Sequence, residues 1–345
     1  MISKIYVVAF KRVVTGGTES LHQLVSKLNE LGKQAKIYYI DEPGAIVPEK
    51  FKKYQVESVD VIEDSSDNWL IVPETRVEFL KKFYQIKKSI WWLSLDFYLK
   101  KYPIYRTLEV CRRKSIPKIF FPIVWIFLLV TKRFNFEHLR INQMENNILH
   151  LYNCEYVHEY LKEHRIDEKM MIYLCGPISD DYFENSAEQM ERENIILYNP
   201  AKNFKFTERV IRALKKNRDD IEIYPIKNMT SEEIINLMKK SKVYMDFGIF
   251  PGPERIPREA VVLGCNIITS RNGSAANKKD VLIDDKYKFK AVKGNIRNIV
   301  NMISDLMEQY EKHYPEYEDY RKKVIDQKKL FDENVSLIVQ RMEKM

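Results

Sequence analysis

Short apolar runs alternate with amphipathic stretches along the first half of the chain. Apolar positions at 21, 24, 25, 28 and 31 repeat with the spacing of a helix. A second helix is predicted over residues 75–83. The predicted strands lie at residues 4–9, 35–40, 69–72 and 89–95. Strands that alternate with helices in this way are typical of a parallel α/β sheet.

The same alternation begins again in the second half. After a helix predicted at residues 150–164 and a strand at 170–174, a polar, acidic stretch at 181–193 predicts a linker. The later predicted strands lie at residues 195–198, 221–225 and 243–246, and the helices at 207–216 and 230–240. Thr230 and Glu233 have the spacing of a capping box at the start of the last helix. We therefore expect two α/β domains, at residues 1–180 and 194–320.

The last 25 residues carry an apolar stripe with helical spacing. Its members are Phe331, Val335, Ile338, Val339 and Met342. The stripe predicts a helix over residues 321–345 that packs back on the body of the protein.

Composition agrees with a folded protein of about two domains. Hydrophobic residues make up 45% and charged residues 31% of the 345 residues. The four cysteines are far apart and form no Cys-x-x-Cys pair, which predicts neither a zinc knuckle nor a disulfide framework. No cleavage site follows the apolar residues 2–10, so we expect a cytoplasmic protein.

The chain is basic, with a net charge of +8. Such an excess attracts phosphate-bearing partners. The sequence has no zinc-finger spacing, no aromatic RNA-binding signature and no dense arginine run. We therefore do not expect nucleic acid among its partners.

An apolar run at residues 119–130 has cations on both sides. Arg112, Arg113, Lys114 and Lys118 precede it, and Lys132 and Arg133 follow it. A membrane-spanning helix needs about 20 apolar residues, so this run is too short to span. A segment of this kind can lie in the headgroup layer of a membrane. Two interpretations stay open for residues 112–133, a membrane-surface contact and a buried core helix.

The segment 243–269 is the most specific part of the sequence. It reads as a strand, a loop with Gly248 and Gly252, a helix that opens near Pro257, and another strand. Backbone N–H groups at such a helix start can bind a phosphate. Arg255 and Arg258 add positive charge for a diphosphate, and Glu259 can accept hydrogen bonds from a ribose diol. Compensation of the helix dipole and a surface ion pair are the alternative interpretation of Arg258 and Glu259.

This segment resembles the nucleotide-sugar-binding helix of bacterial glycosyltransferases with the GT-B fold, of the group one or family-four type. Residues 198–202, 226–230 and 273–277 are similar to stretches that these enzymes place around the donor. The N-terminal half is similar through less specific features, which are Gly16, Gly17 and Thr18 on the acceptor-side loop, Glu74, and residues 91–96. The resemblance implies an α/β fold of two Rossmann-like domains that face each other across a cleft.

The resemblance also implies roles for individual residues. Glu259 would bind the donor ribose, Lys202 and Arg255 or Arg258 would hold the diphosphate, and Met229 would lie by the base. Further residues on the donor side are Asn199, Asp246, Gly248, Gly252 and Ser274. The family has a second glutamate eight positions before Glu259, where this chain has Pro251. Its contact to the sugar would be absent, or supplied by Asp246 or by N–H groups near Gly252.

The expected reaction needs no metal ion and no other cofactor. The chain has no Asp-x-Asp pair of the kind that holds a divalent cation on a nucleotide diphosphate. Cations and helix dipoles would then stabilise the leaving group. The candidate catalytic bases are His22, Glu74 and Asp96, and His22 can equally be a polar position on an amphipathic helix.

These patterns together predict glycosyl transfer from a nucleotide-diphosphate sugar to a saccharide acceptor. We expect a lipid-linked acceptor, such as a polyprenyl-diphosphate saccharide, in the synthesis of capsule or lipopolysaccharide O-antigen at the inner membrane face. Two alternatives stay open, a nucleotide-sugar epimerase of the same fold and a catalytically silent assembly protein at the membrane surface.

Overall fold

The structure is a computed structural model that describes residues 2–114, 116–186, 190–216 and 218–345. The chain forms two compact units. Unit 1 consists of residues 1–176 and 331–345, and unit 2 of residues 177–330. The boundary after Gly176 precedes the expected linker at 181–193, which lies in unit 2 and whose residues 187–189 are outside the described residues.

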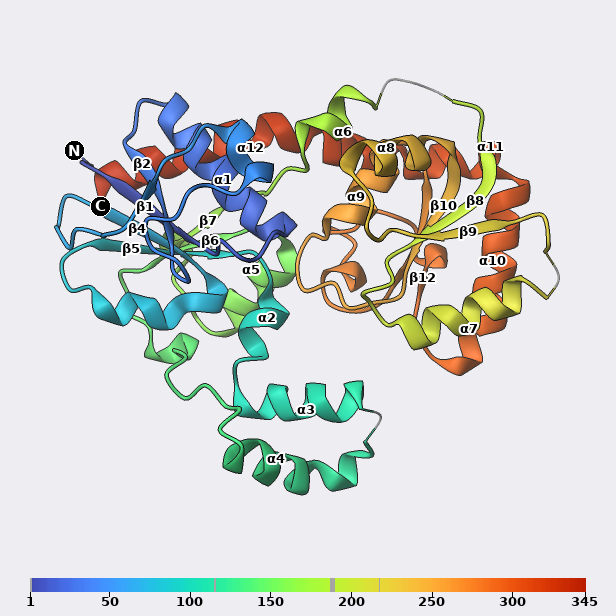
Figure 1. Cartoon of the computed structure of the whole chain (residues 1–345), viewed down its shortest axis with the longest axis horizontal. Helices are drawn as coiled ribbons and strands as arrows, with labels where there is room; N and C mark the ends of the chain where they lie inside the picture. Colours follow the sequence, from blue (N-terminus) through green and yellow to red (C-terminus); the bar gives the residue numbers. More distant parts are fainter. Residues whose placement is uncertain (1, 115, 187–189, 217) are drawn as a thin grey trace. The chain divides into compact units, whose positions relative to one another are not determined.

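Unit 1 is built on a parallel sheet of seven strands in the order β3-β2-β1-β4-β5-β6-β7 (Figure 1). The strands are β1 (Ile5–Ala9), β2 (Ala35–Tyr39), β3 (Ser58–Val59), β4 (Trp69–Pro73), β5 (Lys87–Trp92), β6 (Leu149–Tyr152) and β7 (Met171–Tyr173). All residues of β1 and β4 are buried, as expected for central strands that helices cover on both faces. Chain order changes direction between β1 and β4, and ligands of open α/β sheets bind at such a point.

The connections of unit 1 are helical. The α-helices are α1 (Gly16–Glu30), α2 (Leu95–Leu99), α3 (Pro103–Arg113), α4 (Phe121–Val130) and α5 (Glu155–Glu163), and the 3-10 helices include η1 (Glu49–Tyr54), η2 (Glu74–Lys82) and η3 (Lys118–Phe120). Two predictions were wrong in part. Strand β6 occupies the start of the helix predicted at 150–164, and the strand predicted at 89–95 ends at Trp92.

Unit 2 holds a second parallel sheet, with the order β12-β11-β10-β8-β9. Its strands are β8 (Glu193–Tyr198), β9 (Glu222–Pro225), β10 (Ser241–Asp246), β11 (Asn266–Ser270) and β12 (Lys288–Phe289). Its helices are α6 (Asp180–Glu184), α7 (Phe204–Leu214), α8 (Ser231–Lys240), α9 (Arg255–Val262), α10 (Ile296–Glu308) and α11 (Tyr310–His313). Helices α7 and α10 cover one face of this sheet, and α8 and α9 cover the other (Figure 1).

The predicted C-terminal helix is present as α12 (Glu318–Lys344). Its first part, up to Leu330, belongs to unit 2, and its last part, from Phe331, belongs to unit 1. In unit 1 it forms ion pairs with α1 and the residues after it, Lys27 to Asp332 at 2.9 Å and Lys33 to Glu343 at 2.5 Å. The helix therefore packs on the body, as its apolar stripe predicts.

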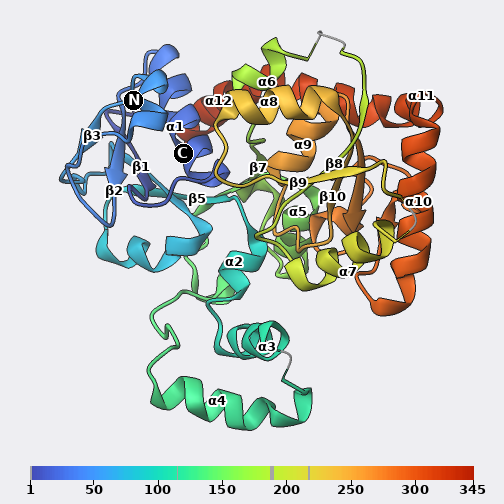
Figure 2. The same cartoon turned by 45° about the vertical axis from the view of Figure 1, so that its right-hand side comes forward.

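The apolar run at 119–130 forms η3 and α4 and lies outside the core of unit 1. Figures 1 and 2 show α3 and α4 as a hairpin that stands apart from the sheet of this unit. Most side chains of the run are exposed, so the buried-helix interpretation does not hold. In the part of the chain that the structure describes, no helix is both long enough and apolar enough to cross a membrane.

Candidate functional site

The carboxyl ends of β8, β9, β10 and β11 lie on one edge of the sheet of unit 2, because these strands are parallel and adjacent. The loops that leave this edge carry the donor residues expected from the sequence. They are residues 199–203 after β8, 226–230 after β9, 247–254 after β10 and 271–277 after β11. Ligands of open α/β sheets bind at this edge.

Lys202 is the centre of the polar contacts at this edge. Its Nζ lies 2.5 Å from Glu254 Oε2 and 3.8 Å from Asp246 Oδ2, and it donates to Ile249 O at 3.2 Å. It also lies over the Phe250 ring, 5.0 Å from the centroid. We call Lys202, Asp246 and Glu254 the Lys202 cluster. The loop after β8 and the two ends of the loop between β10 and α9, which are distant from each other in sequence, meet in it.

Gly248 allows Lys202 to reach this position. A Cβ atom at Gly248 would lie 2.5 Å from Lys202 Cβ and 2.8 Å from Lys202 Cδ. Side chains do not approach a Cβ atom so closely, so no other residue fits here without a shift of the Lys202 stem. Close approach of another chain segment, rather than backbone geometry, is the reason for glycine at this place.

The Lys202 cluster holds more carboxylates than cations. Burial raises the pKa of Asp246, an effect that Lys202 and the Gly248 N–H, which donates to Asp246 Oδ1 at 2.8 Å, oppose. Burial likewise raises the pKa of Glu254, against the attraction of Lys202. The Tyr244 hydroxyl donates to Asp246 Oδ2 at 3.2 Å. Proton uptake by the cluster is thus easier than by exposed carboxyls.

The guanidinium group of Arg258 is hydrogen-bonded to other groups of the protein. The residue is 3% exposed, and its guanidinium donates to Glu254 O at 3.1 Å, to Pro253 O at 2.9 Å and to Gln327 Oε1 of α12 at 2.7 Å. These bonds fix the loop before α9 to α12. Arg258 thus positions the loop, which differs from the contact with a diphosphate that the resemblance implies.

Arg255 and Glu259 lie in the same helix. Arg255 Nη2 donates to Pro177 O at 2.7 Å, so this side chain is directed toward the start of unit 2. Glu259 is buried in this helix, at 8% exposure. Of the cations expected to hold a diphosphate, Lys202 is the one that the structure brings to Asp246.

Ser274 joins two of the loops. Its hydroxyl donates to Gly252 O at 2.7 Å and its N–H to Phe250 O at 2.9 Å, so residues 271–277 support residues 247–254. Asn199 Oδ1 accepts from Ala201 N at 3.0 Å and shapes the turn before Lys202. Met229 lies half-buried at the end of the loop after β9, directly before the capping box of α8.

Sequence reasoning missed Glu254 and Asn203. Glu254 stands directly before α9, and only the fold brings it to Lys202, so no local pattern could have found it. Asn203 takes a left-handed conformation with φ 44° and donates from Nδ2 to Phe247 O at 3.0 Å. An asparagine before a predicted helix is a weak signal for that conformation.

In unit 1, the buried side chain of Glu74 connects the carboxyl ends of β4 and β5. Glu74 is 2% exposed, and its Oε2 accepts from Leu93 N at 2.9 Å, while Asn153 Nδ2 donates to Leu93 O at 3.1 Å. The residue after β5 is thus held from β4 on one side and from β6 on the other. Burial raises the pKa of Glu74 to about 8.

The other two candidate bases, His22 and Asp96, differ in their hydrogen bonds. Both ring nitrogens of His22 have partners, Thr18 O at 2.7 Å and Tyr39 Oη at 2.8 Å, and the ring stacks on Phe51. His22 is therefore part of the packing of α1. Asp96 is half-buried in the first turn of α2, burial raises its pKa, and its Oδ2 has no hydrogen-bond partner among the described residues.

The expected acceptor-side loop forms the start of α1. Gly16 and Gly17 are its first residues, and the Thr15 side chain caps the helix by accepting from Thr18 N at 3.5 Å. A Cβ at Gly17 would lie 3.7 Å from the Leu93 side chain. The start of α1 and the end of β5 are therefore neighbours at the carboxyl edge of this sheet.

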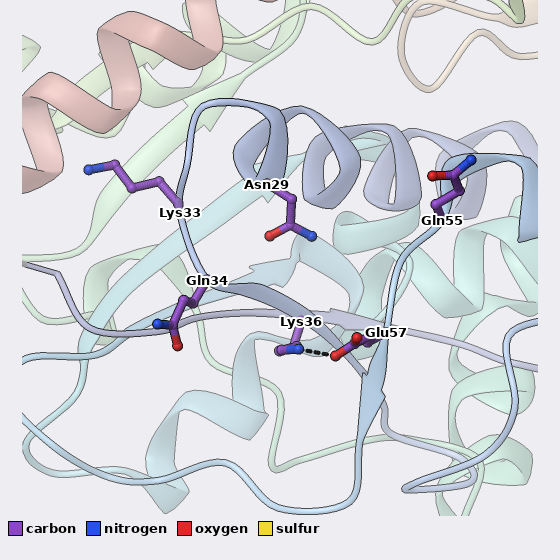
Figure 3. Close-up of a pocket in the computed structure, with 6 residues that line it drawn as sticks. All are labelled: Asn29, Lys33, Gln34, Lys36, Gln55 and Glu57. Atoms are coloured by element: carbon purple, nitrogen blue, oxygen red, sulfur yellow. Dashed lines mark hydrogen bonds and ion pairs between the residues drawn. The ribbon is translucent and has the colours of Figure 1, made fainter.

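The described residues include no group of three or more His, Cys, Asp or Glu side chains that could hold a metal ion. One pocket, of about 290 Å³, lies at the opposite edge of the sheet of unit 1, near the start of β2 (Figure 3). Its lining is polar and comprises Asn29, Lys33, Gln34, Lys36, Gln55 and Glu57. Lys36 and Glu57 form an ion pair across it. This pocket is far along the strands from the candidate residues.

Comparison with known proteins places the fold. No family model matches the chain, and no curated protein matches it. Among solved structures, the glycotransferase of kitacinnamycin matches over 99% of both chains, with a TM-score of 0.56 and 10% identity. Sucrose-phosphate synthase from Thermosynechococcus elongatus matches over 99% of this chain and 98% of its own, at 0.55 and 10%.

A third solved structure is HepE of Anabaena in complex with UDP and glucose. It matches over 99% of this chain and 100% of its own, with a TM-score of 0.51 and 8% identity. These likenesses confirm the predicted α/β fold with two parallel sheets and a C-terminal helix, which is the GT-B fold of glycosyltransferases.

Proposed function

We propose that this chain is a glycosyltransferase that moves a sugar from a nucleotide-diphosphate sugar to a saccharide acceptor. The observation that carries the proposal is the Lys202 cluster, at the carboxyl edge of the sheet of unit 2. The fold supports it, because the matching structures cover nearly the whole chain and include one with UDP and glucose.

Lys202 is the proposed ligand of the donor diphosphate. Its ammonium group is held by Glu254 and Asp246, and a diphosphate would take over these contacts. Glu259 is the proposed partner of the ribose, and the loops with Asn199, Met229, Gly252 and Ser274 would surround the base and the sugar. Arg258 keeps the start of α9 in place for them.

The proposed transfer needs no metal ion. As the bond to the sugar breaks, negative charge grows on the departing diphosphate. A fixed ammonium group and the N-terminal N–H groups of α9 would stabilise that charge, because oriented donors act strongly where water is excluded. In this proposal Lys202 does the work that a divalent cation does in other transferases.

For the acceptor, Asp96 is the proposed base. Its raised pKa brings it closer to neutral pH, and one of its oxygens has no partner among the described residues. The side chains of Glu74 and His22 form hydrogen bonds within unit 1 that support its fold. The start of α1 at Gly16, Gly17 and Thr18 is the proposed neighbour of the acceptor.

We further propose that the acceptor is lipid-linked and serves bacterial surface polysaccharide synthesis, with the enzyme at the inner face of the membrane. The support is the apolar and basic segment 112–133, of which Ser115 lies outside the described residues. An enzyme whose acceptor sits in a membrane gains from a surface that keeps it there.

The test is ligand-observed NMR with UDP-, GDP-, dTDP- and CMP-sugars, with Glu259→Ala as the comparison. We expect saturation transfer to one nucleotide sugar, lost in the variant while its circular dichroism stays that of the wild type. Conversion of the donor without any acceptor would instead identify an epimerase. Binding of no nucleotide sugar would refute the proposal and favour a catalytically silent protein.

A further inference from the structure

Helices α3 and α4 form a small folded unit with its own core. Cys111, Val124, Leu128 and Phe134 are buried together in it. Trp125 packs on Phe134 with 5.0 Å between ring centroids. The hairpin is therefore held in shape from within, although it stands apart from the sheet (Figure 2).

The outer surface of α4 is apolar throughout. The helix has the sequence FPIVWIFLLV, without a polar side chain. Ile119, Ile123 and Val130 are 81%, 64% and 75% exposed, and Ile126 and Phe127 are exposed as well. These five positions follow the spacing i, i+4, i+7, i+8 and i+11, which is one stripe along a helix. Such a continuous exposed apolar surface marks an interaction site.

Helix α3 also carries exposed apolar side chains, beyond the segment that the sequence singled out. Ile104, Tyr105 and Leu108 are exposed on it, and Phe136 is exposed after α4. Ile104 and Leu108 are one helical turn apart and so share a side of α3. The exposed apolar side chains therefore come from both helices of the hairpin.

The rim of this surface is cationic. Lys118 stands before α4 and Lys132 and Arg133 after it, and Arg112 and Arg113 end α3, all of them exposed. Between residues 103 and 136 the chain has one acidic residue, Glu109. Glu109 is already paired with Arg106 at 2.9 Å and Lys100 at 3.7 Å. The hairpin thus presents a net positive charge around an apolar centre.

We propose that the α3–α4 hairpin docks on an anionic lipid bilayer, with α4 lying in the plane of the headgroups. Ten residues of helix measure about 15 Å, half of the hydrocarbon thickness of about 30 Å, so α4 lies on the membrane and does not cross it. Apolar side chains enter the acyl boundary, and the basic rim meets the lipid phosphates.

Charge favours the bilayer over a second copy of this chain. Two hairpins packed face to face would bring their cationic rims together, which costs free energy, whereas an anionic surface neutralises them. The inference rests on the proposed membrane association, which it deepens by naming the surface and the lipid charge. It does not depend on sugar transfer.

The test is co-sedimentation with vesicles of phosphatidylcholine alone and of phosphatidylcholine with phosphatidylglycerol. We expect the wild type to bind the anionic vesicles and to dissociate at high salt. Ile123→Asp and Ile126→Asp should each weaken binding by about tenfold or more, because a carboxylate cannot enter the acyl boundary. Ile46→Asp, at another exposed isoleucine of unit 1, is the matched control and should bind as the wild type.

A second pair of variants tests the rim. Lys132→Glu combined with Arg133→Glu should weaken binding by about fivefold or more for each cation removed. Lys215→Glu combined with Lys216→Glu, an exposed pair in unit 2, makes the same change in net charge and should have little effect. Equal loss in both pairs would refute a specific rim, because overall charge would then explain the binding.

Two results would overturn the inference. One is a wild-type protein that does not bind anionic vesicles. The other is a dimer in lipid-free solution, measured by light scattering, that Ile126→Asp converts to a monomer, since the second copy would then be the occupant. Nucleotide-sugar binding, measured by NMR on the same variants, should stay unchanged. This measurement distinguishes an error in the proposed membrane docking from an error in the proposed donor site.

Discussion

Gly248 is the position where one methyl group would change the donor site. In Gly248→Ala the new Cβ would lie 2.5 Å from Lys202 Cβ, so Lys202 must move away from Asp246 and Glu254. We expect nucleotide-sugar affinity to fall by about tenfold or more and unit 2 to lose about 1–3 kcal/mol of stability. Calorimetric titration and thermal unfolding measure the two effects.

The control for this variant is Gly294→Ala. A Cβ at Gly294 would meet no atom within 4 Å, and this glycine is also in unit 2. It should leave affinity unchanged. Wild-type affinity in Gly248→Ala would show that the diphosphate is not bound by Lys202 in the place seen here.

Glu254 sets the charge that a donor diphosphate meets. Its pKa is raised by burial, so it takes up a proton as pH falls toward that value, and the site then becomes less negative. Wild-type affinity for the nucleotide should therefore increase as pH falls. Glu254→Gln removes this carboxylate while an amide oxygen still faces Lys202, so affinity near pH 8 should increase by about tenfold.

Binding measured from pH 5 to 8 tests this expectation. The other groups that face Glu254 are Lys202, Asp246 and Arg258. Asp246 stays titratable in the variant and leaves a weaker pH dependence. A variant whose affinity falls at every pH would mean that Glu254 contributes position rather than charge.

The sequence was informative about residues whose signal is local. Lys202 follows one predicted strand and Asp246 ends another, both belong to segments on which the resemblance rests, and the structure brings them together. Glu254 could not be found in this way, because its partner is 52 positions away and no pattern joins them. Arg258 carried the expected charge, but its burial against two carbonyl groups depends on the path of the loop and on α12.

At the scale of elements, Arg258 connects α9 to α12. Arg258→Lys keeps the charge but loses the planar fork that reaches Glu254 O, Pro253 O and Gln327. We expect a loss of about 2–4 kcal/mol in the free energy of unfolding of unit 2. Chemical denaturation followed by circular dichroism measures it.

Arg212→Lys is the matched control, because Arg212 is exposed on α7 and pairs with Glu208 at the surface. It should change stability by less than about 1 kcal/mol. If Arg258→Lys kept full stability and lost only donor affinity, Arg258 would be a ligand of the diphosphate and not a positioning residue.

Element prediction succeeded where strands are buried on both faces and failed where tertiary contacts decide. Strands β1 and β4 are continuous apolar runs, β10 and β11 have apolar centres, and the sequence located all four. Most of strand β6 was included in a predicted helix, because it lies two residues before α5 and only its pairing with β5 and β7 makes it a strand. The hairpin was seen as an apolar run, but its exposure could not be predicted, since length alone does not distinguish a core helix from a surface one.

At the scale of the whole molecule, the alternation of strands and helices predicts the two α/β units. It does not predict the boundary between them. The chain leaves unit 1 at Gly176 and returns to it at Phe331, within one continuous helix. A break of this kind has no signature in composition, because α12 keeps its apolar stripe across it.

All four tryptophans, at positions 69, 91, 92 and 125, lie in unit 1. Tryptophan fluorescence therefore reports the unfolding of unit 1 alone.

This property allows a test of Glu74 in the intact chain. The pKa of Glu74 is raised to about 8 in the folded state, from about 4.5 for an ordinary glutamate, because the carboxyl is buried. The folded state therefore binds the proton more tightly than the unfolded state does. The resulting stability is complete below the unfolded pKa and is lost as pH rises toward 8.

Glu74→Gln should remove this pH dependence, since an amide can accept from Leu93 N at every pH. Urea unfolding followed by tryptophan fluorescence should show the variant gaining on the wild type from pH 5 to 8, by at most about 1.4 kcal/mol per pH unit. The comparison cancels other groups, such as buried His150, whose pKa is lowered to about 4 by burial. Glu159→Gln, at an exposed position, should follow the wild type. A constant difference between Glu74→Gln and the wild type across this range would mean that Glu74 is already ionised in the folded protein, with its charge satisfied by the Leu93 N–H.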